Sequence, residues 1–196
     1  AINSFMDEEP DYHGEVKVVH FLTLLRDQIG WDALKAQVKV PLEGWNVAPY
    51  YGCTLTRPQE VAIDDSPNDP TIMRDFLTAL GARSVDYPDE QTCCGSYQVL
   101  SHPEAAMNAA RKVIDSARDH GADVLALSCP LCEYNVGTRQ RHLLAADPDW
   151  SEVPTLYFTQ LLAIALGLGT EAVRPEMSRE VVQEWIKNNS AAGATP

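Results

Sequence analysis

The sequence predicts an α/β fold, a parallel and doubly wound (Rossmann-like) sheet with flanking helices. Short apolar runs of strand length alternate along the chain with segments of helical periodicity. One of these runs, residues 123–128 (DVLALS), is apolar in the way typical of a parallel strand buried on both faces. Gly81 and Gly121 follow the clearest helical segments, at positions where helices end.

The chain opens with helical character before its first strand. Residues 15–27 (EVKVVHFLTLLRD) combine a β-like start with an apolar run that fits a helix, and residues 31–38 continue as a short helix. Residues 45–51 (WNVAPYY) predict a first core strand because aromatic and β-branched residues are enriched in strands. This strand runs directly into Gly52 and Cys53.

A proline-containing acidic loop over residues 57–68 separates this strand from the next helix. Asp69 as N-cap and Pro70 at the first helical position predict where that helix begins, and Gly81 stands just past its end. Residues 84–87 then predict a short second strand.

The second half repeats the alternation. Residues 101–104 (SHPE) form a capping-box pattern that predicts a helix ending at Gly121. Its apolar positions recur at helical spacing at Met107, Ala110, Ile114 and Ala117. After the strand at 123–128, the remaining expected elements are a helix opened by Pro130 over 131–144, a strand at 155–158, a helix over 160–168, an amphipathic helix over 181–187 and a frayed end over 188–196.

Composition places the chain among acidic globular proteins. It has 196 residues, of which 45% are hydrophobic, and a net charge of −13 with a pI near 4.6. This charge argues against nucleic acid and anionic membrane surfaces as partners, since both attract basic patches. The longest apolar stretch, residues 156–169, is too short to span a bilayer. We expect a connector over 1–15, one domain over 16–188 and a flexible tail over 189–196.

All five cysteines belong to one ordered pattern, C-x39-C-C-G-x33-C-P-L-C. An odd number of cysteines, two of them adjacent, argues against a disulfide framework, and the first residues carry no signal-peptide pattern. We therefore expect a reducing, cytoplasmic compartment. Thiolates gathered in this way are the ligands of an iron–sulfur cluster or of zinc. The candidate ligands are Cys53, Cys93, Cys94, Cys129 and Cys132.

The predicted fold explains how cysteines far apart in the sequence would meet. Each cysteine segment follows a predicted strand, and the carboxyl ends of parallel strands line one crevice in which ligands bind. Pro130 places the Cys-x-x-Cys pair on the first turn of a helix, where the N–H groups and the helix dipole favour thiolates. The side chains of Cys93 and Cys94 diverge and are expected to contact different metal atoms, while Gly95 lets the backbone approach the centre closely.

The number of cysteines exceeds what the simple alternatives need. Structural zinc and a cubane four-iron cluster each take four cysteines, so a fifth indicates an unusual cluster geometry. A structural zinc site remains the alternative on ligand chemistry. Arg57, four residues after Cys53, is a candidate to neutralise the cluster or a substrate carboxylate, with a surface ion pair as the alternative. No phosphate-binding, dinucleotide or serine-nucleophile motif is present, so the chain needs a redox partner.

The cysteine segments and the residues around them resemble the family of heterodisulfide reductase B subunits and their relatives (Cys-Cys-Gly domain), in particular its C-terminal module. The similarity covers nearly all of residues 15–170. It is carried by the five cysteines together with PYYGCTLTRP at 49–58, Tyr87-Pro88 before Cys93-Cys94-Gly95, and GAD at 121–123 before Cys129-Pro130-Leu131-Cys132. The family usually carries two such modules, so the resemblance leaves open a C-terminal half of a longer subunit or a natural single-module subunit.

The resemblance implies a non-cubane [4Fe-4S] cluster held by all five cysteines. It further implies an oxidoreductase subunit that reduces a disulfide, or relays electrons to a thiol, a disulfide or a quinone, with iron–sulfur and flavin proteins as partners. The alternative function is a structural zinc module that holds a redox complex together. Thr54 departs from the family pattern, because methanogen enzymes usually carry a histidine there. That departure argues against the coenzyme M–coenzyme B disulfide as the substrate.

Overall fold

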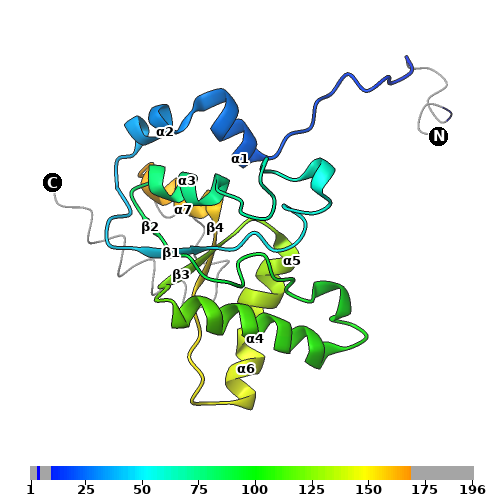
Figure 1. Cartoon of the computed structure of the whole chain (residues 1–196), viewed down its shortest axis with the longest axis vertical. Helices are drawn as coiled ribbons and strands as arrows, with labels where there is room; N and C mark the ends of the chain where they lie inside the picture. The colour runs from blue at the N-terminus through cyan, green and yellow to red at the C-terminus, as the bar shows by residue number, and fades with distance from the viewer. Residues whose placement is uncertain (1–3, 5–9, 169–196) are drawn as a thin grey trace.

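The computed structural model describes residue 4 and residues 10–168, and within them a parallel sheet with helices on both faces (Figure 1). Its four strands lie in the order β2-β1-β3-β4, and every neighbouring pair is parallel. The predicted parallel α/β class is confirmed. The strands are β1 (Asn46–Pro49), β2 (Arg83–Ser84), β3 (Val124–Leu127) and β4 (Thr155–Tyr157), each shorter than the sequence predicts.

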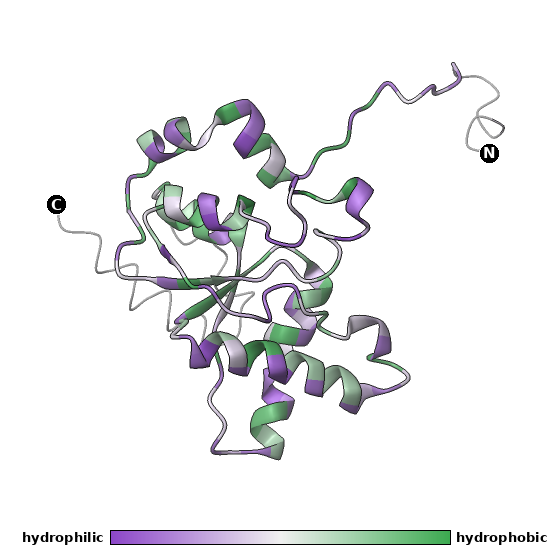
Figure 2. Cartoon of the chain, viewed as in Figure 1, coloured by the Kyte–Doolittle hydropathy of each residue, from purple (hydrophilic) through white to green (hydrophobic). Residues whose placement is uncertain are grey.

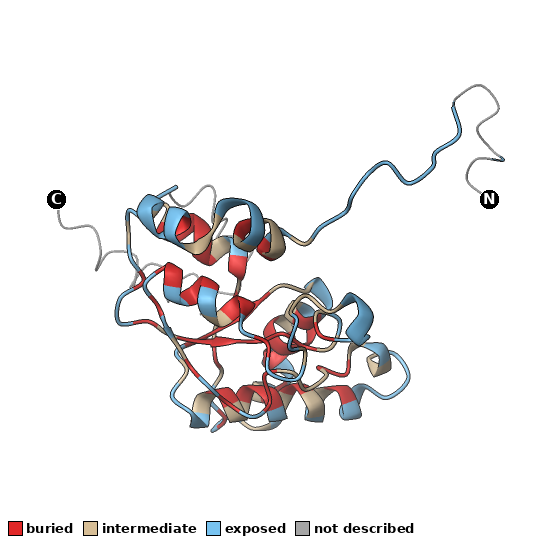
Figure 3. Ribbon diagram, turned by 45° about the horizontal axis from the view of Figure 1, so that its top comes forward, coloured by how far each residue is buried: buried red, intermediate tan, exposed pale blue. Residues whose placement is uncertain are grey.

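The sheet separates two apolar cores. Alternate residues of a strand point to opposite faces, so Val124 and Ala126 of β3 join one core while Leu125 and Leu127 join the other. All four residues of β3 are fully buried, as the apolar run predicts, and the strands form the buried centre of the molecule (Figure 3).

Two groups of helices cover the two faces. We call the core beneath α1, α2, α3 and α7 the first core, and the core beneath α4, α5 and α6 the second core. The helices carry both hydrophobic and hydrophilic residues (Figure 2), and their buried apolar residues, such as Phe76 of α3 and Ile114 of α4, belong to these cores. The helices are α1 (Phe21–Leu24), α2 (Trp31–Gln37), α3 (Ile72–Ala79), α4 (Pro103–Asp119), α5 (Pro130–Cys132), α6 (Gln140–Ala146) and α7 (Phe158–Ala165); η2 (Leu25–Ile29) and η5 (Glu133–Thr138) are π-helical, and η3 (Gln59–Val61) and η4 (Ser96–Gln98) are 3₁₀ turns.

The start of α3 differs from the sequence prediction because a distant side chain caps it. Asp69 is not the N-cap; Thr71 takes that position. Asp64, from the preceding loop, accepts hydrogen bonds from the backbone N–H groups of Thr71 and Ile72, both at 2.9 Å. The free N–H groups of the first turn are therefore satisfied from outside the local sequence.

Helix α4 and the segment after β3 also depart in detail. The capping box is absent: α4 begins at Pro103 after His102, and Ser101 Oγ lies 3.1 Å from the His102 ring instead of capping the helix. The segment that Pro130 opens is not one regular α-helix, since the π-helical η5 interrupts it. A Cβ atom on Gly137 in η5 would lie 2.5 Å from Thr155 Oγ1 of β4, so the π turn packs against the sheet too closely for a side chain.

The outer segments give fewer elements than the sequence predicts. Residues 15–20 do not form a strand, and the regular structure begins with α1. The helix predicted over 181–187 and the end at 188–196 lie outside the described residues. No helix within residues 10–168 combines the length and the apolar character needed to cross a membrane.

Candidate metal centre

The five cysteines come from three loops at the carboxyl edge of the sheet. Cys53 lies four residues after β1, Cys93 and Cys94 follow the chain that leaves β2, and Cys129 lies two residues after β3. Cys132 ends α5 and is therefore one short helical segment away from Cys129. All five are free thiols.

Side-chain contacts link these five thiols in two sets, which the peptide bond between Cys93 and Cys94 joins; we call the five together the cysteine cluster. Cys53 hydrogen-bonds Cys93. Cys94 and Cys132 lie with their Sγ atoms 3.7 Å apart, and Cys132 also hydrogen-bonds Cys129. The adjacent residues Cys93 and Cys94 thus contact different cysteines, and their binding to different metal atoms stays a prediction. The structure brings together every cysteine of the sequence pattern.

The inner part of the cysteine cluster is buried, and its two thiols are hydrogen-bonded to each other. Cys94 and Cys132 are 1% and 5% exposed. The hydrogen bond from Cys132 lowers the pKa of Cys94 to about 6, while the same hydrogen bond and burial raise the pKa of Cys132. The lowered pKa of Cys94 favours its thiolate, which is the form that binds metals.

The outer part of the cysteine cluster reaches solvent. Cys53, Cys93 and Cys129 are partly exposed. Burial and the neighbouring Cys93 raise the pKa of Cys53. The backbone N–H of Gly95 lies 3.4 Å from Cys93 Sγ and donates to it. The cysteine cluster therefore has a buried edge, Cys94 and Cys132, in the second core. Its other edge, Cys53, Cys93 and Cys129, is open to solvent and small molecules.

Two hydrogen-bonded contacts tie the loop of Cys53 to the loop of Cys93 and Cys94. The Tyr50 hydroxyl donates to the carbonyl of Thr92 at 2.6 Å. The N–H groups of Tyr51 and Gly52 donate to the carbonyl of Glu90 at 2.9 and 3.2 Å. Sequence reasoning did not find Tyr50 and Glu90, because their function as ties depends on contacts between residues about 40 positions apart.

The Glu90 side chain anchors the same loops to α3. The Glu90 side chain is 8% exposed, and its carboxylate accepts a hydrogen bond from Arg74 Nη2 at 2.6 Å. Burial raises the pKa of Glu90 even though Arg74 acts in the opposite direction. Arg74 in turn pairs with Asp69 at 2.9 Å, so the residue predicted as a helix cap serves in this ion-pair group instead.

Asn135 is a buried side chain in contact with Cys94, whose sulfur also accepts hydrogen bonds from the backbone and the hydroxyl of Ser96. It is 1% exposed, and its Nδ2 donates to the carbonyl of Cys94 at 3.2 Å and lies 3.8 Å from Cys94 Sγ. It stands in the π-helical η5, and π turns are frequent at functional sites. The sequence offers no local signal for this contact.

Two further predicted site residues have different surroundings. Gly95 has a positive φ of 75°, and an added Cβ would meet the backbone of Ala106 in α4 at 2.9 Å. Its close approach is thus to α4, and contact with a cofactor stays a prediction. Arg57 is exposed and forms no hydrogen bond or ion pair with any residue of the described part; its role also stays a prediction.

The donor set fits a metal centre. Two sulfurs that bind one metal at about 2.3 Å in a tetrahedral arrangement lie about 3.8 Å apart, close to the 3.7 Å between Cys94 and Cys132. Among the described residues, however, no three or more His, Cys, Asp or Glu side chains surround one point as a single ion requires. Cys94 and Cys132 are therefore the pair whose spacing suits two ligands of one metal atom.

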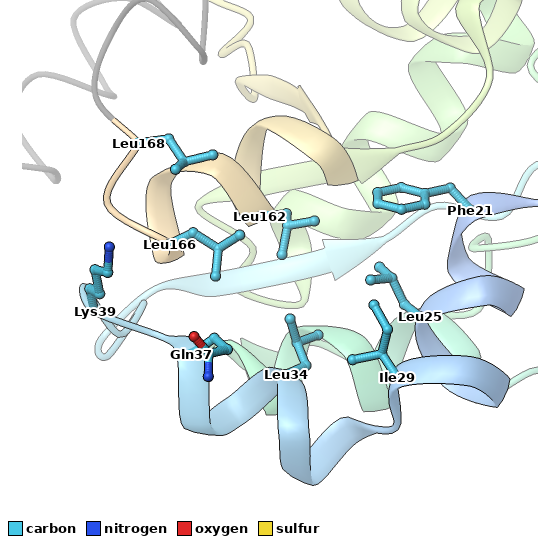
Figure 4. Close-up of a pocket in the computed structure, with 9 residues that line it drawn as sticks. All are labelled: Phe21, Leu25, Ile29, Leu34, Gln37, Lys39, Leu162, Leu166 and Leu168. Atoms are coloured by element: carbon cyan, nitrogen blue, oxygen red, sulfur yellow. The ribbon is translucent and has the colours of Figure 1, made fainter.

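A separate apolar pocket of about 380 Å³ lies on the other face of the sheet (Figure 4). Phe21 and Leu25 line it from α1 and η2, and Leu162 from α7, with Lys39 and Gln37 at one end. None of its lining residues is a cysteine. The pocket is therefore distinct from the cysteine cluster.

Comparison with known proteins agrees with the cysteine pattern. Residues 47–137 match the family model of the cysteine-rich domain called CCG, a range that contains all five cysteines. The chain is 31% identical over 168 residues to the 8-methylmenaquinol:fumarate reductase membrane anchor subunit of Wolinella succinogenes. It is 28% identical over 173 residues to the B subunit of the Ferredoxin/F(420)H(2)-dependent CoB-CoM heterodisulfide reductase of Methanosarcina acetivorans.

These relatives are longer than the chain. The alignments cover 85% and 86% of this chain but 58% and 56% of the two relatives, so the chain spans about half of their length. A protein of Archaeoglobus profundus that is itself described as similar to the heterodisulfide reductase B subunit gives the same picture, with 28% identity and 56% of its length covered. A solved structure of a hypothetical protein from Helicobacter pylori shares the fold, with a TM-score of 0.63 at 13% identity over 85% of this chain and 29% of that chain.

Proposed function

This chain carries a CCG cysteine-rich domain and is a distant homologue of the heterodisulfide reductase B subunit and of a fumarate reductase anchor subunit; from this premise we propose that it is an iron–sulfur subunit of a heterodisulfide reductase-like oxidoreductase. Cys53, Cys93, Cys94, Cys129 and Cys132 together hold one [4Fe-4S] cluster of non-cubane geometry. The partners are other iron–sulfur and flavin subunits, which exchange electrons with it.

The observation that carries the proposal is the set of five free thiols at one edge of the sheet, with the sulfurs of Cys94 and Cys132 in contact at 3.7 Å. Four cysteines would satisfy a structural zinc ion or a cubane cluster. The fifth thiol is neither distant nor engaged in a disulfide, so it is available as a ligand. This availability favours the cluster over the alternative, a structural zinc module.

When bound, the cluster supplies one-electron steps at a sulfur-rich centre. Reduction of a disulfide to two thiols consumes two electrons and two protons. The buried pair Cys94 and Cys132 fixes the centre in the second core, and the open edge at Cys53 and Cys93 admits a small disulfide or thiol. A quinone is the alternative acceptor of the electrons that the cluster carries.

Two exposed residues next to Cys53 shape this open edge. Thr54 and Arg57 both face solvent. Thr54 provides no imidazole proton donor, so the product thiolate takes its proton from solvent. Arg57, with its guanidinium unpaired among the described residues, is positioned to meet a substrate carboxylate.

Iron and acid-labile sulfide analysis of anaerobically prepared protein tests the cofactor. We expect a brown protein with about four irons per chain and matching sulfide. A colourless protein with one zinc per chain would reject the cluster and leave the structural zinc module.

Cys94→Ser tests whether the centre works in electron transfer. We expect loss of disulfide-reducing turnover in the assembled complex while the circular dichroism of the chain stays that of a folded α/β protein. Thr78→Ser, an exposed change in α3 on the other face of the sheet, is the control that retains turnover. Full activity of Cys94→Ser would contradict the catalytic assignment and favour a scaffold.

A further inference from the structure

Arg139 is a buried cation that has no anionic partner among the residues that the structure describes. The residue is 8% exposed, and no Asp or Glu carboxylate among the described residues lies within 4 Å of its guanidinium. Its two contacts are neutral: Nη1 donates to Asn135 Oδ1 at 3.4 Å and Nη2 donates to the carbonyl of Pro103 at 3.3 Å. Burial of a charge is unfavourable unless an opposite charge or good hydrogen bonds compensate it, so the surroundings of Arg139 call for negative charge.

The cysteine cluster can supply negative charge on this side of the sheet, and the Asn135 side chain connects it with Arg139. Asn135 accepts from Arg139 with its amide oxygen and places its amide nitrogen 3.8 Å from Cys94 Sγ. A hydrogen bond to a charged donor polarises an amide, which makes its N–H groups stronger donors. Arg139 thereby acts on Cys94 through Asn135, because the polarised amide stabilises negative charge on the buried sulfur.

The local fold holds this series in place. Asn135 is fixed by its second hydrogen bond, to the carbonyl of Cys94 at 3.2 Å. Arg139 is fixed between η5 and the first turn of α4 by the Pro103 carbonyl. Both side chains come from the helical segment that also carries Cys132, so the ligand and its charged support belong to one rigid unit.

We propose that Arg139, acting through Asn135, is the internal counter-charge of the cysteine centre and raises the reduction potential of the cluster bound there. Both are positioning residues, since neither is a ligand. The inference rests on the proposed iron–sulfur function. Its physical basis is that reduction adds an electron to an already anionic centre, and the potential of such a centre depends on nearby charge and on hydrogen bonds to its sulfurs.

A matched pair of substitutions tests the counter-charge. Arg139→Gln removes the buried cation, and Arg141→Gln removes the same charge from an exposed position two residues away. We expect Arg139→Gln to weaken the electron affinity of the cluster about tenfold, a decrease of about 59 mV in midpoint potential for one electron. Arg141→Gln should leave the potential unchanged, because water and salt screen its charge. Arg139→Lys keeps the charge and should restore most of the loss.

A double-mutant cycle tests whether Arg139 acts through Asn135. Asn135→Ala should also lower the potential, and the double variant should lower it by less than the sum of the two single changes, since both remove the same connection. Potentials are measured by anaerobic titration followed in the visible spectrum, with iron, sulfide and apo-protein melting temperature recorded for each variant. Asn135→Ala keeps the inference testable if Arg139→Gln does not fold.

The outcomes separate the two proposals. If the wild-type protein takes up no iron and sulfide, the proposed function fails and the inference fails with it. If the wild type binds the cluster but Arg139→Gln and Asn135→Ala keep its potential, the inference alone is wrong. A lower melting temperature with an unchanged potential would reduce Arg139 to a structural tie between η5 and α4.

Discussion

At the scale of single residues, Gly52 determines how closely the loop of Cys53 can approach Cys132. Its φ is +63°, and an added Cβ would lie 3.1 Å from Cys132 Sγ and 3.8 Å from the Tyr50 ring. Gly44 has a similar φ of +82° with no atom within 4 Å of an added Cβ. The two glycines thus share the backbone requirement, while only Gly52 has neighbours, the Cys132 sulfur and the Tyr50 ring, that an added methyl group would meet.

We expect Gly52→Ala to lower cluster occupancy, because the methyl group displaces the Cys132 sulfur from its neighbours. Both Gly52→Ala and Gly44→Ala should lose roughly 1–2 kcal/mol of stability from the left-handed backbone. Only Gly52→Ala should also lose iron after reconstitution. Equal iron contents in the two variants, measured per folded chain, would show that the sulfur tolerates the methyl group.

The sequence identifies the cysteines but not the residues that arrange them. Cysteines are recognised because their type and spacing already state a metal-binding chemistry. Tyr50, Glu90 and Asn135 act through backbone carbonyls and through contacts with residues about 40 positions away. Such contacts exist only after the sheet has brought the loops together, so no local sequence pattern predicts them.

At the scale of elements, α3 depends on a cap supplied from outside the helix. Asp64 holds the N–H groups of Thr71 and Ile72, both at 2.9 Å. Asp64→Ala should destabilise the chain by about 1 kcal/mol, the usual loss when a capping side chain is removed. Asp65→Ala, on the neighbouring exposed residue, is the control in urea unfolding. The same midpoint for both variants would show that the cap is not needed.

The contribution of Asp64 should depend on pH. Partial burial acts to raise its pKa, but hydrogen bonds from the backbone N–H groups of Thr71, Ile72 and Ser66 outweigh this and lower the pKa below 3.8. A lowered pKa in the folded state stabilises the protein above the unfolded value of about 3.9, and that stabilisation is lost as the pH falls through the folded value. The stability difference between wild type and Asp64→Ala should therefore be full at pH 7 and shrink below about pH 4. A difference that stays constant down to pH 3 would contradict this account.

The elements that the sequence predicts well are those whose signals are local. The apolar run of β3 and the glycine after α4 each act within a few residues, and the structure agrees with both. The start of α3 and the π-helical η5 are set by tertiary contacts, with Asp64 for the first and with Thr155 against Gly137 for the second. Tertiary contacts override local propensity, which is why the sequence prediction fails at these two places.

At the scale of the whole molecule, the sheet separates the cysteine cluster from half of the apolar core. Cys94 and Cys132 belong to the second core, beneath α4, α5 and α6, and Cys129 packs against it. The first core contains none of the cysteines. A bound cluster would join the three loops at the carboxyl edge, while α3 and α7 keep their packing whether or not metal is present. Local regions of a protein can open independently of the global fold.

Metal removal should therefore loosen one side of the molecule only. The amides of Gly52, Gln98 and Glu133 donate to carbonyls within the cysteine loops, whereas those of Leu80 and Leu166 close α3 and α7. In native-state hydrogen exchange, we expect removal of the cluster by a chelator to speed exchange of the first three about tenfold or more, which corresponds to about 1.4 kcal/mol. The amides of Leu80 and Leu166 should exchange at nearly unchanged rates. The free energy of metal binding would then stabilise only the loops at the carboxyl edge. If exchange of all five amides accelerated equally, the metal would instead stabilise the entire fold.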